Sequence, residues 1–135
     1  MKFFFDNNLP PHLAAAIAAL SKPEGHTVVH LREKFAPSIR DVDWIRALAA
    51  EKDWVIVSGD YQISRKEHEK QAWRESGLTA FFLVKGWTNF SFWDQSYRLV
   101  RWWPRIIEQA KLVQPGAGFE VPINATSKFR QIVFK

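Results

Sequence analysis

The chain has 135 residues, which suits one domain with a hydrophobic core and is too short for two comfortable ones. It contains no cysteine, which excludes disulfides, thiolate metal sites and cysteine nucleophiles. Its 19 Lys and Arg residues against 14 acidic residues leave a net charge of +5, which favours a nucleic-acid partner only mildly.

The first half of the chain alternates predicted strands and helices. Residues 2–6 predict a strand. A helix follows, with Asn8 as a candidate cap, Pro10 and Pro11 in its first turn and an alanine-rich continuation over 12–20. Three more elements follow: a strand over 26–30, a helix over 41–52 and a strand over 54–60. This alternation is typical of an α/β sheet with parallel strands.

The second half begins with a predicted helix over 64–76 and a strand over 79–84. A long helix starts at Ser91, and Pro104 should kink or break it. Two short strands are predicted at 119–123 and 129–134. We therefore expect one domain over 1–112 and an irregular C-terminal extension, 113–135, packed on it.

Neither a signal peptide nor an apolar stretch of about 20 residues is present in the sequence. We therefore expect a soluble cytoplasmic protein that does not associate with membranes.

Two of the apolar runs end on aspartates, Asp6 and Asp60. An open α/β sheet places its ligand site at the carboxyl ends of its strands, so we expect both carboxylates at one site. On the 41–52 helix, Asp41 lies within about 40° of the middle of the buried side, whereas Asp43 projects nearly opposite. An acidic side chain on the inward face is costly unless it is paired or bound to a cation. Asp41 is therefore the favoured third ligand, beside Asp6 and Asp60, of a metal ion at this site.

Ser58 points to the same side of its strand as Asp60, and could orient a carboxylate or a metal-bound water. Asp43 is interpreted as a solvated residue that the helix dipole favours. The alternative for the whole set is that Asp41 caps its helix while Asp6 and Asp60 are ordinary turn residues.

Basic residues recur at helical spacing after Asp60 and again in the long helix, and such rows would neutralise RNA phosphates. The candidates are Arg65, Lys66, Lys70, Arg98 and Arg101. The alternative is a pair of ordinary solvated helix faces. The tryptophan-rich stretches 87–93 and 102–103 could stack on bases, or belong to the core or to a protein interface.

Four segments, in this order, resemble the PIN-like domains allied to VapC-type toxins, over residues 1–85: Phe4-Phe5-Asp6-Asn7-Asn8-Leu9-Pro10, Asp41-Val42-Asp43-Trp44-Ile45, Val57-Ser58-Gly59-Asp60, and Ser76-Gly77-Leu78 before Phe81-Phe82-Leu83. The resemblance implies a three-layer α/β/α fold with a mainly parallel sheet of about four to five strands.

It also implies a Mg²⁺- or Mn²⁺-dependent endoribonuclease, with Asp6, Asp41 and Asp60 as metal ligands and Ser58 completing the catalytic set. Many members carry a second acid near the first, where this chain has Asn7 and Asn8. Additional candidate site residues are Asp43, Glu69 and Asn8. The implied partners are an RNA substrate, an antitoxin protein and a second copy of the chain.

Two other classes remain open. One is a catalytically inactive PIN-like module that binds RNA or a protein. The other is a receiver-type phosphoacceptor domain, which is disfavoured because adjacent acids after the first strand and a lysine at a later strand end are not evident.

Overall fold

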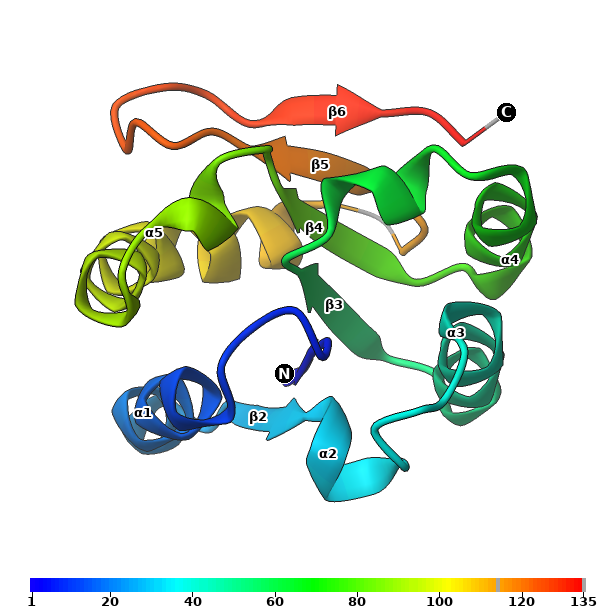
Figure 1. Cartoon of the computed structure of the whole chain (residues 1–135), viewed down its shortest axis with the longest axis horizontal. Coiled ribbons are helices and arrows are strands. Elements are labelled where there is room, and N and C mark those ends of the chain that lie inside the picture. The colour runs from blue at the N-terminus through cyan, green and yellow to red at the C-terminus, as the bar shows by residue number, and fades with distance from the viewer. Residues whose placement is uncertain (114, 135) are drawn as a thin grey trace.

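Over residues 1–113 and 115–134, a computed structural model describes one sheet of six strands in the order β2-β1-β3-β4-β5-β6 (Figure 1). The strands are β1 (Lys2–Phe5), β2 (Thr27–His30), β3 (Trp54–Ser58), β4 (Thr79–Leu83), β5 (Gly118–Val121) and β6 (Arg130–Ile132). The first five are mutually parallel, and β6 runs antiparallel to β5. The mainly parallel sheet is therefore confirmed, and it has more strands than the four to five expected, because both C-terminal strands join it.

Helices cover both faces of this sheet. In Figure 1, α1 (Pro11–Ser21) and α5 (Phe92–Leu112) lie to the left of the sheet, and α3 (Asp41–Glu51) and α4 (Glu67–Ser76) lie to the right. The short connecting elements are α2 (Leu31–Lys34), η1 (Lys22–Glu24), η2 (Tyr61–Ser64) and η3 (Trp87–Asn89). This is the predicted three-layer arrangement.

The central strands are buried on both faces, which explains their continuous apolar runs. Successive side chains of a strand point to opposite faces. Phe3 and Phe5 therefore pack in the core under α1 and α5, while Phe4 packs in the core under α3 and α4. All three phenylalanines are fully buried.

Several predicted boundaries shift. The helix predicted from residue 64 begins at Glu67, because η2 precedes it. The α1 helix has Pro10, not Asn8, at its cap position, because the Asn8 N–H turns back to the Asp6 carboxylate. Pro104 does not break α5, which continues to Leu112 with buried side chains on both sides of the proline; a kink there stays a prediction.

The C-terminal segment adds β5 and β6 to the edge of the sheet. Arg105 of α5 fastens this segment by donating to the carbonyl oxygens of Ala125 and Ser127, the latter at 2.8 Å. Residues 114 and 135 of the predicted extension lie outside the described residues, and the boundary at 112 stays a prediction. In the described part of the chain, each helix is too short or too polar to cross a bilayer.

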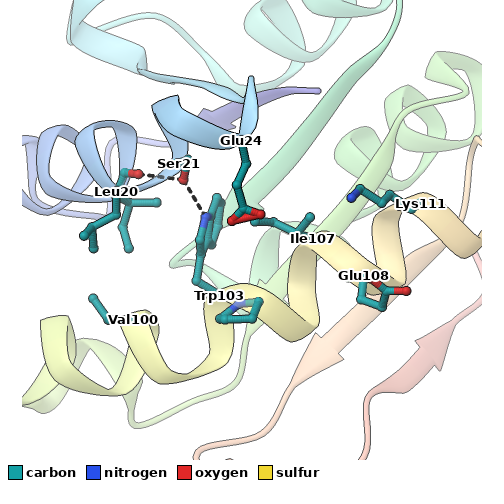
Figure 2. Close-up of a pocket in the computed structure, with 10 residues that line it drawn as sticks. Leu20, Ser21, Glu24, Val100, Trp103, Ile107, Glu108 and Lys111 are labelled. Atoms are coloured by element: carbon teal, nitrogen blue, oxygen red, sulfur yellow. Dashed lines mark hydrogen bonds between the residues drawn. The ribbon is translucent and has the colours of Figure 1, made fainter.

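A buried hydrogen bond joins α1 to α5 (Figure 2). Trp103 Nε1 donates to Ser21 Oγ at 2.8 Å, and Ser21 Oγ donates to the Ile17 carbonyl at 2.6 Å. A cavity of about 300 Å³ adjoins this pair, with Glu24 and Lys111 at its rim. The serine thus satisfies the only polar atom of an indole that is otherwise packed among apolar side chains.

Replacing Ser21 by alanine should lower the free energy of unfolding by about 1–3 kcal/mol, because the buried Trp103 N–H loses its acceptor. Urea unfolding measures the change. Ser96→Ala is the matched control: Ser96 Oγ makes the same bond to the carbonyl four residues earlier, but at an exposed position. Equal losses in the two variants would contradict the assigned role of Ser21.

Candidate active site

The strand order changes direction between β1 and β3. The chain leaves β1 through α1 to reach β2 on one side, and later passes through α3, on the opposite face, to reach β3 on the other side of β1. Ligands of open α/β sheets bind at such a switch point, outside the carboxyl ends of the strands. Asp6 follows β1 at this point, and Ser58 ends β3 with Asp60 just beyond.

Three donors hold the Asp6 carboxylate, which is only 2% exposed. Ser58 Oγ donates to Oδ2 in a very short contact, and the backbone N–H groups of Asn8 and Gly59 each donate to Oδ1 at 3.1 Å. A Cβ atom at Gly59 would lie 3.1 Å from the carbonyl oxygen of Asn8. Glycine at position 59 therefore permits the close approach of the two turns that grip the carboxylate.

Burial raises the pKa of Asp6 from 3.8 to about 6, although the three hydrogen bonds act in the opposite direction. The nearby Asp41 carboxylate raises this pKa further. None of the ion pairs among the described residues includes Asp6. The ionised form of Asp6 is therefore costly in the folded chain.

Asp41 begins α3 and is half-buried, and its Oδ1 accepts a hydrogen bond from Trp44 Nε1 at 3.0 Å. Its pKa is raised, first by burial and then by the carboxylates of Glu69 and Asp60, while Lys66 opposes the shift. Asp41 thus interacts electrostatically with Asp6, Asp60 and Glu69. The structure brings these four predicted acids into one region.

Asp60 caps η2, where its Oδ1 accepts from the Gln62 N–H at 3.0 Å. The Asp60 N–H donates to Ser58 Oγ at 3.1 Å. Ser58 therefore links the strand-end aspartates: its hydroxyl donates to the Asp6 carboxylate and accepts from the Asp60 backbone.

The donor set suits a hard divalent cation, which prefers carboxylate and other oxygen ligands. Its arrangement is open, however: within residues 1–113 and 115–134, no three acidic or histidine side chains are placed so as to coordinate one ion. The physical reason is local. Trp44 engages Asp41 and Gln62 engages Asp60, and the Asp6 carboxylate is gripped by its own turns.

Residues 1–85 match the family model described as a PIN like domain. The chain belongs to the PIN-like domain family. The matched segment contains Asp6, Asp41, Ser58, Asp60 and Glu69. It decides against the receiver-type alternative, while the alliance of this PIN-like domain with VapC-type toxins stays a proposal. The comparison with curated proteins and the comparison with solved structures each gave no match.

Two further predicted site residues, Asp43 and Asn8, do not direct their side chains to the Asp6 carboxylate. Asp43 forms an ion pair with Arg40 at 2.8 Å on the outer side of α3, and the hydrogen bond from Arg40 lowers the pKa of Asp43. Asn8 contributes its backbone N–H to Asp6, and its side chain is exposed beside Asp60.

The predicted RNA-binding residues are scattered. Arg65 pairs with Glu120 of β5 at 3.5 Å, and Lys70 pairs with Glu67 at 3.9 Å. The Arg98 guanidinium lies 4.2 Å from the centre of the Phe90 ring, whereas Arg101 is exposed on α5. Lys66 is the candidate whose charge acts on Asp41.

The tryptophans divide between core and surface. Trp87, Trp102 and Trp103 are buried, whereas Trp93 is 79% exposed beside the exposed Phe92. Only the start of α5 therefore presents an indole ring to a partner.

Lys85, Thr88 and Asn89 were not predicted as site residues, yet they line a cleft that Asp60 also lines. Lys85 lies two residues after the end of β4, as Asp60 lies two residues after the end of β3, so the expectation that no later strand ends near a lysine is wrong. The strand-end rule that selects Asp6 and Asp60 would also have selected Lys85.

Replacing Asp6 by asparagine should stabilise the domain at pH 8 and lose this advantage as the pH falls toward 4. The raised pKa of Asp6 means that the folded chain binds a proton more tightly than the unfolded chain, so stability falls as the pH rises from about 4 to about 6. A shift from 3.8 to about 6 corresponds to at most about 3 kcal/mol.

Urea unfolding at pH 4 and pH 8 measures the effect. Asp43→Asn is the control in which the change in stability should have the opposite sign. The pair with Arg40 lowers the pKa of Asp43, so this variant should be less stable than the parent chain at pH 8. A destabilisation of Asp6→Asn of equal size at both pH values would show that the charge of Asp6 carries no such cost.

Proposed function

We propose that this PIN-like domain is a Mg²⁺- or Mn²⁺-dependent endoribonuclease and acts in the cytoplasm as the toxin of a toxin–antitoxin pair. One observation carries the proposal: a buried aspartate with a raised pKa lies at the switch point of the sheet, within the field of a second carboxylate. Carboxylates whose charges disfavour one another are stabilised by a shared cation.

Asp6, Asp41 and Asp60 would hold the ion, with Glu69 as an additional ligand. When bound, a divalent ion supplies an activated water and offsets charge on the phosphodiester. Ser58 positions Asp6 through its hydroxyl. Asp41 is the carboxylate that we assign to accept the proton of the attacking water, because it is only half-buried whereas Asp6 is buried.

Two features of the surface favour RNA and protein as the partners of this domain. The net charge of +5 and the exposed Lys66 and Arg101 favour a polyanion. The start of α5 exposes Phe92, Trp93 and Tyr97, a concentration of aromatic side chains that is typical of protein interfaces. We assign this aromatic surface to binding of the antitoxin, with a second copy of the chain as the alternative occupant.

A second candidate function is a catalytically inactive PIN-like module that binds RNA or a protein. Two observations favour it. Asn7 and Asn8 stand where many family members carry an acid, and the described carboxylates do not surround one ion.

RNA cleavage in the presence of Mg²⁺, Mn²⁺ or EDTA distinguishes the two functions. The parent chain should cut RNA with either ion and not with EDTA. Asp6→Asn and Asp60→Asn should each lose activity by about a hundredfold or more, since even the loss of an outer-shell partner of a metal ligand costs about 10–100-fold. Asp43→Asn, whose carboxylate pairs with Arg40, should stay within about twofold of the parent.

Activity that survives both Asp6→Asn and Asp60→Asn would contradict the metal-dependent mechanism. A folded parent chain that shows neither cleavage nor a rise in unfolding temperature with either ion would establish the inactive module instead.

A further inference from the structure

A polar cleft of about 280 Å³ opens beside the acids, at the carboxyl ends of β3 and β4. One wall comes from the turns after β1 and β3, and the other from the segment after β4 together with η3. The side chains that matter are Asn8, Asp60, Gln62, Lys85, Thr88 and Asn89. Nothing in the proposed catalytic set uses this second wall.

The composition of the cleft selects a class of ligand. Lys85 is its cation, and none of the ion pairs among residues 1–113 and 115–134 involves it. Three amide side chains accompany it, and an amide offers both a donor and an acceptor to the edge of a base. A lysine together with amides matches a phosphate joined to a heterocycle.

Both walls are packed against neighbouring segments. On one side, the Gly59 turn lies directly against Asn8. On the other side, Gly86 has a φ of 106°, which favours glycine, and its Cα faces Ile123 so closely that a Cβ would lie 3.1 Å from the Ile123 side chain. The turn that carries Lys85 is therefore packed against the C-terminal segment.

A competing hollow of about 550 Å³ between α3 and α4 is a poorer seat for a phosphate. Asp41 and Glu69 both line it, and their carboxylates repel a second anion. Its two arginines face a third carboxylate, Asp43: Arg40 pairs with it, and the charge of Arg46 acts on it. The cleft at Lys85 contains one carboxylate, that of Asp60. Its cation, Lys85, takes part in none of the ion pairs between described residues.

We infer that the Lys85 cleft seats one nucleotide next to the phosphodiester that is cut, with Lys85 on a phosphate and Asn8, Gln62 and Asn89 at the edge of the base. Cleavage next to this nucleotide rests on the proposed function, whereas binding of the nucleotide does not. A volume near the lower end for ligand pockets fits one unpaired nucleotide and not a duplex. Asn89 and Gln62 then determine which base is preferred.

Binding of a fluorescent single-stranded RNA of mixed sequence, measured in EDTA over a series of salt concentrations, tests the inference without any cleavage. Lys85→Met should weaken binding about tenfold, as expected for a charged contact. It should also reduce the slope of log affinity against log salt by about 0.7, the share of one phosphate on a single strand. Lys128→Met, at an exposed position before β6, is the matched control and should change neither quantity.

An unchanged affinity and slope in Lys85→Met would overturn the inference, and so would equal losses in Lys128→Met or a parent chain that binds no RNA. Cleavage by the parent chain together with a silent Lys85→Met would leave the nuclease proposal standing and remove the cleft. Binding that depends on Lys85, in a chain that cuts nothing with either ion, would keep the cleft and remove the nuclease.

Discussion

The burial of one carboxylate governs this molecule. Asp6 follows the apolar strand β1, which lies between β2 and β3, and its side chain is out of contact with water. Its oxygens accept hydrogen bonds from two backbone N–H groups in the turns after β1 and β3, and from the hydroxyl of Ser58, the last residue of β3. No basic side chain of the described residues pairs with it. A proton or a bound cation is what relieves this charge.

The aromatic core and the candidate site are connected through Trp44. Its ring packs against Phe4 of β1, with centroids 5.1 Å apart, and against Trp73 of α4 at 5.8 Å. Its indole N–H donates to Asp41. The packing that buries α3 and α4 on the sheet therefore also fixes where the second carboxylate stands relative to the first.

Local patterns predicted much of this arrangement from the sequence. Uninterrupted apolar runs locate β1, β3 and β4, and the same runs place Asp6, Ser58 and Asp60 at one sheet edge. What escaped prediction depends on pairing between distant segments. Arg65 meets Glu120 only because β5 joins the sheet beside β4, and α5 passes Pro104 only because the sheet lies beneath it. The hydrogen bonds from Trp44 to Asp41 and from the Gln62 N–H to Asp60 were also not predicted, because sequence spacing does not encode how side chains are oriented.

The charge state of Asp6 is the central quantity, and an NMR titration of its side-chain carboxyl carbon measures it directly. Without divalent ions, the midpoint should lie near the raised pKa of about 6, and saturating Mg²⁺ should move it downward because the ion favours the carboxylate. A midpoint at the ordinary value of 3.8 would contradict the burial of an unpaired charge. A raised midpoint that Mg²⁺ leaves unchanged would contradict a cation site at the switch point of the sheet.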